Sequence, residues 1–285
     1  MNLGLVLSGG GLKGNAHIGV LEALDDLGIH PTVITGTSAG SIVAAMYLMG
    51  FSTAHMQEIS LNFNKDLLNF NFQGLRRTLW AYATLQRAPL DHFRGFLSAT
   101  KLDAYFDQLF NGQMLTDISA PFAFVSTDLV SGKEVLLTNH TLKVDNTLVL
   151  TNVKIGDAVR ASMSVPVVFV PKHLNGLELV DGGVLDNLPV DAARMLGADK
   201  VIGVNLEAAA GLKEADDLLE IMGKSIQLLA NRSQFYKNFL ADVYINPDLS
   251  QFTTNDFSPQ DAKRMMEIGY KATMAQHEAI LALLK

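Results

Sequence analysis

The chain has 285 residues, of which 48% are hydrophobic and 18% are charged, and this composition excludes an intrinsically disordered protein. Cysteine is absent, which excludes disulfides, thiolate nucleophiles and thiolate metal sites. The formal net charge of -7 argues against a nucleic-acid partner, because phosphate contacts need clustered cations.

The N-terminal residues 1–7 favour a soluble protein. They have no basic region, and their apolar run passes straight into glycines, so we interpret them as a strand and not a signal peptide. No apolar run approaches the roughly 18 residues that are needed to span a bilayer. We therefore predict a cytoplasmic location, with peripheral contact at a membrane as an option.

The first half of the chain begins with two strand–helix units. Residues 2–7 predict a buried strand that ends in glycines, and a helix with apolar residues at helical spacing follows as far as Gly28. Residues 32–35 predict a second strand, and the almost entirely apolar stretch 42–48 predicts a buried helix. From about residue 51 to 100 the pattern is irregular and rich in aromatic residues, which indicates a helical cap or insertion over a sheet.

The second half of the chain alternates between strands and helices. The predicted strands are 121–127, 134–138, 178–180, 201–206 and 242–245. The predicted helices are 153–161, 188–196, 212–229 and one long helix from about 259 to 284. This alternation implies a mainly parallel sheet with helices on both faces, and we interpret residues 1–285 as a single α/β domain.

A glycine-rich turn after the first strand is the first motif with chemical content. Residues 9–14 read Gly-Gly-Gly-Leu-Lys-Gly, and glycine amides next to a helix N-terminus suit an anion. The same residues satisfy the G-x-G-x-x-G dinucleotide fingerprint. That fold needs an acid about twenty residues later, where this chain has Thr35-Gly36-Thr37. A Walker P-loop is excluded because its lysine and hydroxyl residue are not in the required order.

The second motif, Gly36-Thr37-Ser38-Ala39-Gly40, lies at the end of the second strand. It matches G-x-S-x-G, the nucleophile elbow. The flanking glycines, Gly36 and Gly40, let a strand turn abruptly into a helix, so that the Ser38 hydroxyl projects from the turn. A capped helix start, with Thr37 or Ser38 as the N-cap, is the alternative interpretation.

The third motif is Asp181-Gly182-Gly183, directly after the predicted strand 178–180. An acid at the end of a buried strand, followed by two glycines, can approach another strand end closely. A turn residue that bonds its own backbone is the alternative for an isolated Asp-Gly pair. Together the three motifs supply an anion cradle, an exposed serine and an acid, all at strand ends, and acyl transfer requires these three parts.

In order and spacing, these motifs resemble the patatin-like phospholipases, particularly short bacterial members and the catalytic domain of neuropathy-target-esterase-like lysophospholipases. The resemblance covers nearly the whole chain. It extends to Ala161-Ser162-Met163-Ser164-Val165-Pro166 with Phe169 and Pro171, and to Asp186-Asn187-Leu188-Pro189. One departure is Lys13, where the family usually carries arginine, so that the charge is kept and the planar fork is lost.

The resemblance implies a three-layer α/β/α patatin-like fold and a Ser-Asp dyad without a catalytic histidine. Carried over by position, Ser38 is the nucleophile, Asp181 is the base, and the backbone of Gly9, Gly10 and Gly11 forms the oxyanion hole. The implied substrate is a phospholipid, a lysophospholipid or a simple fatty-acyl ester, and the scheme uses no metal and no cofactor.

The sequence allows two other functional hypotheses. A conventional triad would need a histidine after Asp181, and only His277 follows it. His277 lies inside a predicted long helix, and Ser38 comes too early for an α/β-hydrolase, so we disfavour this triad. A non-catalytic lipid-binding or regulatory protein that keeps the fold is the competing hypothesis from another class.

Residues 73–101 are the only strongly basic stretch. Five cations face the single acid Asp91, and aromatic residues lie among them. The cations are Arg76, Arg77, Arg87, Arg94 and Lys101. This stretch could dock on anionic lipid headgroups, or it could form a cap over an acyl groove with a solvated basic face.

Overall fold

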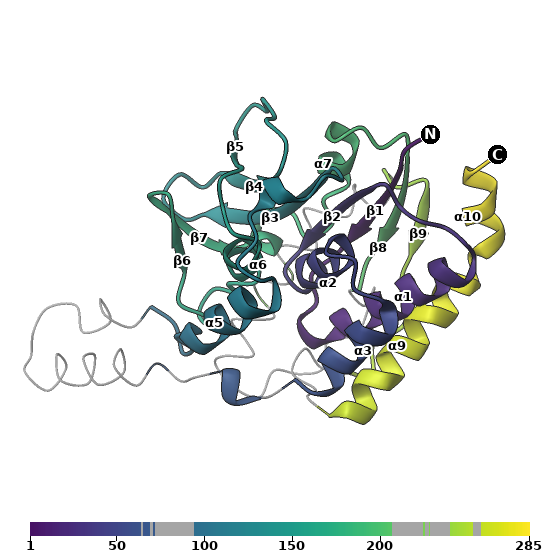
Figure 1. Ribbon diagram of the computed structural model, residues 1–285, viewed down its shortest axis with the longest axis horizontal. Helices are drawn as coiled ribbons and strands as arrows, with labels where there is room; N and C mark the ends of the chain where they lie inside the picture. The colour runs from purple at the N-terminus through teal and green to yellow at the C-terminus, as the bar shows by residue number, and fades with distance from the viewer. Residues whose placement is uncertain are drawn as a thin grey trace, which may run out of the picture.

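A computed structural model describes residues 1–63, 65–68, 71, 94–206, 225, 228, 240–252 and 258–285. Its centre is a nine-stranded sheet, and helices pack against it on both faces (Figure 1). The predicted α/β class is therefore confirmed. The predicted helix 212–229, apart from residues 225 and 228, and most of the basic stretch 73–101 lie outside the described residues.

The sheet is mixed but mainly parallel. Its strands are β1 (Leu3–Leu7), β2 (Val33–Thr37), β3 (Phe122–Asp128), β4 (Glu134–Thr138), β5 (Thr147–Leu150), β6 (Lys172–Leu174), β7 (Leu177–Asp181), β8 (Lys200–Val204) and β9 (Val243–Ile245). The order is β5-β4-β3-β2-β1-β8-β9, and β6 and β7 branch from β3. The pairs of β3 with β4 and β7, and of β6 with β7, are antiparallel, and the other pairs are parallel.

Alternate side chains of the central strands enter two different hydrophobic cores. On β3, Phe122 and Phe124 join the larger core, whereas Ala123 and Val125 join the smaller one. A strand exposes successive side chains to opposite faces, so continuous burial along β3 requires cover on both sides. This burial explains the near-continuous apolar runs from which the strands were predicted.

Several helices cover the two faces of the sheet. They are α1 (Asn15–Asp26), α2 (Ala39–Leu48), α3 (Thr53–Leu61), α5 (Thr100–Leu109), α6 (Ile155–Ser162), α7 (Val190–Met195), α9 (Pro259–Met274) and α10 (His277–Leu283), with short 3-10 turns η1 (Gly11–Gly14), η2 (Lys65–Leu67), η3 (Leu115–Asp117) and η4 (Gly182–Val184). Residues of α7 belong to the smaller core, and α1, α2 and α9 contribute to the larger one. No helix in the described ranges is both long and apolar enough to cross a membrane.

The sequence-based prediction of one long C-terminal helix is wrong. The helix stops at Met274 and a second one starts at His277. The His277 side chain contacts the backbone at the break between the two helices. Its Nδ1 lies 2.8 Å from the backbone oxygen of Met274. This side-chain contact replaces a backbone hydrogen bond at the helix end.

The position of β7 along β3 decides where the functional motifs meet. β4 occupies one edge of β3 over residues 123–127. On the other edge, β2 runs parallel to β3 and ends with Thr37 opposite Val125, while β7 runs antiparallel and ends with Asp181 opposite Ser126. The two strands therefore approach along one edge from opposite directions, and their carboxyl ends are neighbours.

Candidate active site

Ser38 occupies a sharp turn between β2 and α2. Its backbone has φ 53° and ψ -121°, a conformation that L-residues rarely adopt. Its side chain makes no capping hydrogen bond to α2, and the Thr37 hydroxyl donates to the backbone oxygen of Asp186 at 2.9 Å. The alternative of a helix start capped by either hydroxyl is therefore wrong.

The glycines around Ser38 are needed because two chain segments approach closely. A Cβ on Gly36 would lie 2.7 Å from the carbonyl carbon of Gly40, and a Cβ on Gly40 would lie 2.1 Å from the backbone oxygen of Leu7. Real Cβ atoms do not approach other atoms so closely. The G-x-S-x-G spacing thus lets α2 start directly against β1 and β2.

Asp181 is buried beside Ser38. Only 6% of each of the two residues is exposed. The carboxylate oxygen Oδ1 accepts the Gly183 amide at 2.7 Å, whereas Oδ2 has no hydrogen-bond partner among the described residues. Burial raises the pKa of Asp181 from 3.8 to about 6, and the Ser38 hydroxyl and the Gly183 amide act against this rise.

The contact between Ser38 and Asp181 is close but is not an aligned hydrogen bond. The Ser38 hydroxyl is near enough to lower the pKa of Asp181, yet it does not satisfy hydrogen-bond geometry with the free oxygen Oδ2. Contacts between a serine and its base are often loose without a ligand and tighten only when substrate binds.

The glycine-rich turn after β1 lies against Ser38. A Cβ on Gly9 would be 3.0 Å from the Cβ of Ser38. The Gly9 amide donates to the side-chain oxygen Oδ1 of Asn187 at 2.9 Å. The amides of Gly10 and Gly11 donate to no group within the described residues, and Gly11 has φ 58°, which favours glycine.

The two glycines after Asp181 are required by packing. A Cβ on Gly182 would lie 2.3 Å from the backbone oxygen of Val125, and one on Gly183 would lie 3.0 Å from the Asp181 carboxylate. Asn187, which receives no role from the sequence motifs, bonds Gly9 and lies close to Gly183. The only sequence signal for Asn187 is its place in the segment 186–189.

As candidate partners of Ser38 and Asp181, His277 and His17 lie in different environments. His277 is exposed on α10, on the opposite side of the molecule from β7, so the triad with His277 is excluded (Figure 1). His17 is fully buried in α1, and its Nε2 lies 2.8 Å from the backbone oxygen of Ser8. Burial lowers the pKa of His17 to about 4, so the ring is neutral at pH 7.

Two cations of the basic stretch are described, and both are engaged. Arg94 forms an ion pair with Glu178, and the Lys101 ammonium donates to the backbone oxygen of Asp66 at 3.2 Å. Arg76, Arg77 and Arg87 lie outside the described residues.

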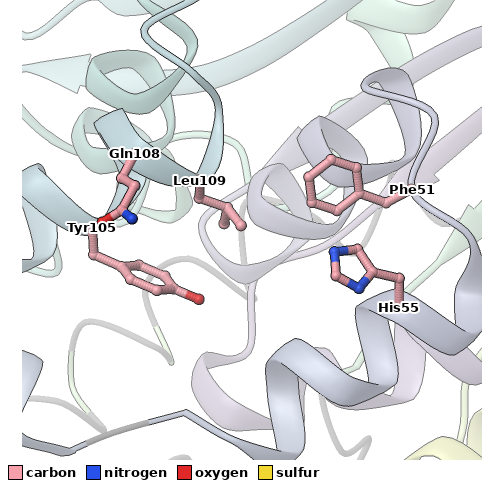
Figure 2. A pocket seen from close by; sticks show the side chains of 5 residues that line it. All are labelled: Phe51, His55, Tyr105, Gln108 and Leu109. Atoms are coloured by element: carbon pink, nitrogen blue, oxygen red, sulfur yellow. The ribbon is translucent and has the colours of Figure 1, made fainter.

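A pocket of about 310 Å³ opens between α3 and α5, away from the predicted catalytic residues. Phe51 and His55 face Tyr105, Gln108 and Leu109 across it (Figure 2). None of these residues was singled out in the sequence as a functional candidate, and neither Ser38 nor Asp181 lines this pocket.

Comparison with known proteins gives the family. Residues 5–194 match the family model of patatin-like phospholipases. The chain is 25% identical over 294 residues to a lysophospholipase NTE1 of Meyerozyma guilliermondii, covering 94% of this chain and 19% of that protein. It is 30% identical over 212 residues to an uncharacterized NTE family protein of Mycobacterium tuberculosis, covering 72% of this chain and 49% of that protein. The chain thus spans about half or less of the length of these curated relatives.

Solved structures agree with the fold. VipD from Legionella pneumophila superposes with a TM-score of 0.53 at 17% identity, covering 98% of this chain and 67% of that chain. Human GIVD cytosolic phospholipase A2 superposes with a TM-score of 0.50 at 12% identity, covering 99% of this chain and 58% of that chain. Because the family model matches residues 5–194, which are more than half of this chain, the chain belongs to the patatin-like phospholipase family.

Proposed function

We propose that the chain is a serine acyl hydrolase that cleaves carboxylic esters of lipids, with Ser38 as the nucleophile and Asp181 as the base. The observation that carries this proposal is the meeting of β2 and β7 on one edge of β3. This meeting brings a strained serine next to a buried carboxylate with an unpaired oxygen.

The raised pKa of Asp181 supports its role as the base. At a pKa of about 6, the carboxylate is still ionised at pH 7 but is a stronger base than an ordinary aspartate. Asp181 would take the Ser38 proton as Oγ attacks the ester carbonyl, and would return it to the leaving alcohol. It would then activate the water that hydrolyses the acyl-enzyme.

The negative charge that develops on the ester carbonyl oxygen needs N–H donors that are not already hydrogen-bonded within the protein. The Gly9 amide is bonded to Asn187, so we revise the sequence-based assignment and propose that the amides of Gly10 and Gly11 form the oxyanion hole. The N-terminus of α2, directly after Ser38, adds a partial positive charge. Loss of one such donor typically lowers the rate by a factor on the order of 10² to 10³.

Phospholipids or lysophospholipids are the proposed substrates. The family and the yeast relative named as a lysophospholipase support this class. We also propose that residues 73–101 make a peripheral contact with a lipid surface, with their cations facing anionic headgroups.

Hydrolysis of a short-chain nitrophenyl ester and of lysophosphatidylcholine tests the proposal. We expect turnover by the wild type, none by Ser38→Ala, and a collapse in Asp181→Asn. His277→Ala is the matched control and is expected to keep full activity. A folded wild type that hydrolyses neither substrate would support the non-catalytic alternative.

A further inference from the structure

A short segment at the C-terminal end of α6, residues 162–164, contacts both proposed catalytic residues. The side-chain oxygen Oγ of Ser162 accepts the Ser38 amide at 2.9 Å, and the backbone oxygen of Ser164 accepts the Asp181 amide at 2.9 Å. We propose that Ser162 is a positioning residue that holds Ser38 in its reactive conformation. This inference rests on the proposed function.

The Ser162 hydroxyl makes two hydrogen bonds at once, one as an acceptor and one as a donor. It accepts from Ser38 and donates to the backbone oxygen of Val125 at 2.6 Å. Ser162 is fully buried, so bulk water does not compete for either bond, and loss of the hydroxyl would leave buried groups without their partner. Because Val125 is the β3 residue opposite Thr37, Ser162 ties the turn at Ser38 to the strand that also carries β7.

The strained backbone of Ser38 gives this bond its importance. The Ser38 φ of 53° lies outside the backbone conformations that L-residues usually adopt. Such a conformation persists only when the surrounding structure holds it in place. The two backbone groups of Ser38 are held by hydroxyls, since the Ser41 side chain donates to the Ser38 oxygen at 2.6 Å. Without Ser162 the Ser38 amide would be unpaired, and the turn could relax away from Asp181.

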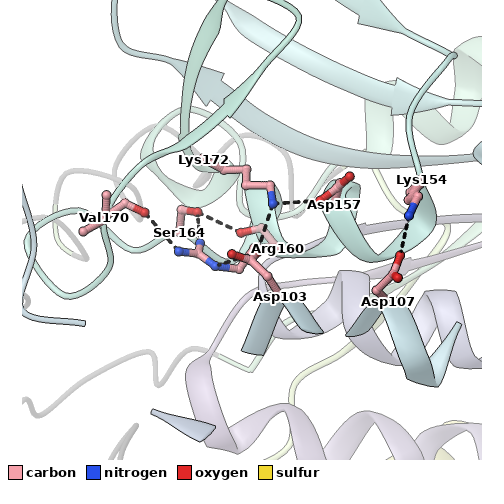
Figure 3. A network of polar contacts seen from close by, with 8 residues as sticks. All are labelled: Asp103, Asp107, Lys154, Asp157, Arg160, Ser164, Val170 and Lys172. Carbon is pink, nitrogen blue, oxygen red and sulfur yellow. Dashed lines mark hydrogen bonds and ion pairs between the residues drawn. The ribbon is translucent and has the colours of Figure 1, made fainter. Parts of the chain in front are cut away.

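The other end of the segment is anchored by Arg160. Its guanidinium donates to the Ser164 hydroxyl and, at 3.0 Å, to the backbone oxygen of Val170 (Figure 3). Asp103 of α5 lies 3.6 Å from Nε of Arg160, and Lys172 bridges Asp103 to α6. Arg160 is 2% exposed, and its bonds tie Ser164 to Val170, so residues 162–164 link Ser38 to Asp181 through an anchored segment.

Thr138 provides a control with the same local chemistry. Its hydroxyl donates to the backbone oxygen of Phe122 on β3 and accepts the His140 amide at 3.2 Å. Thr138 is also fully buried, but neither of its bonds involves Ser38 or Asp181. Thr138→Val and Ser162→Ala therefore remove equivalent pairs of hydrogen bonds, and only the second change frees Ser38.

The experiment compares kcat and KM for an ester substrate in wild type, Ser162→Ala, Ser162→Thr and Thr138→Val, with thermal unfolding of each. We expect Ser162→Ala to lose about 10- to 100-fold in kcat with little change in KM, because a small misplacement of a reacting group has that effect. Ser162→Thr keeps the hydroxyl and is expected to recover most of the rate. Thr138→Val is expected to lose stability but not kcat.

The outcomes separate this inference from the proposed function. An inactive wild type contradicts the proposed function. If the wild type is active and Ser162→Ala has the same kcat as Thr138→Val, the positioning role of Ser162 is overturned. The proposed function then remains intact.

Discussion

Asp181 lies in an environment that differs strongly from that of a solvent-exposed aspartate. It is buried with one oxygen unpaired, and its pKa is raised to about 6. A surface aspartate would titrate about two pH units lower. The ionisation of this proposed base is therefore expected in a pH range that is easily measured.

We expect kcat/KM to fall as the pH drops below about 6, because protonated Asp181 cannot accept the Ser38 proton. The measurement is a pH–rate profile between pH 4.5 and 8, supported by circular dichroism to show that the protein stays folded. A profile that stays flat down to about pH 4.5 would mean that an ordinary carboxylate, or none, limits the reaction.

Asp181→Asn is expected to stabilise the protein at pH 8. The folded pKa is raised above the unfolded value, so the native state binds the extra proton, and stability falls as the pH rises from about 3.8 to about 6. A neutral amide avoids this loss and can keep the bond from Gly183. The expected gain in the free energy of unfolding is about 2 to 3 kcal/mol.

Chemical denaturation at pH 8 and pH 4 measures this gain. It should be several times smaller near pH 4, where the carboxyl is protonated in the folded state and nearly half protonated in the unfolded state. His17 acts in the opposite sense, because its lowered pKa costs stability as the pH falls from 6.5 towards 4. This contribution is common to both proteins and cancels in the difference; a variant less stable than wild type at pH 8 would refute the prediction.

The sequence identified residues with distinctive local patterns and missed those that act through tertiary contacts. Ser38 and Asp181 stand next to glycines that signal tight turns, so both could be singled out. Ser162 was visible only as part of a family-like segment without a role, and Arg160 was not singled out in the sequence. The Gly9 amide could not be recognised as occupied, because its partner Asn187 lies far away in the chain.

At the scale of elements, seven of the nine strands could be predicted, whereas β5 and β6 were missed and the pairing partners of the strands could not be predicted. The apolar runs of β2, β3 and β7 are local signals, whereas the sharing of one β3 edge by β2 and β7 is a contact between distant segments. No property of residues 177–181 alone indicates an antiparallel pairing. The break between α9 and α10 was missed for a different reason, because Ala275 and Gln276 are good helix formers and their local pattern favours a continuous helix.

The crossing of α1 and α9 gives a prediction for these elements. A Cβ on Gly269 would lie 2.0 Å from the backbone oxygen of Ala16, and one on Gly19 would lie 1.8 Å from that of Met266. Gly269→Ala should therefore push the two helices apart and destabilise the protein by about 1 to 3 kcal/mol, although alanine favours an isolated helix.

Thermal unfolding of Gly269→Ala and Gly28→Ala tests this explanation. Gly28 has φ 68° but open space around its Cβ position, so its substitution costs only backbone strain, about 1 kcal/mol. If Gly269→Ala proved as stable as the wild type, close packing between α1 and α9 would not hold these helices together.

On the scale of the whole molecule, two hydrophobic cores support one strained site. The continuous burial of β1, β2 and β3 fixes the sheet edge on which the turn at Ser38 and the end of β7 meet. Such a scaffold can maintain an unusual serine backbone and an unpaired buried carboxylate, both of which cost stability locally. The coarse α/β architecture follows from the sequence because it depends on this apolar periodicity.

The most direct test of the account is labelling by a fluorophosphonate, followed by intact mass and peptide mapping. We predict one adduct per wild-type chain, located on Ser38, with none in Ser38→Ala and strongly slowed labelling in Asp181→Asn. An unlabelled but folded wild type, or an adduct on another residue, would contradict the assignment of Ser38 as the nucleophile.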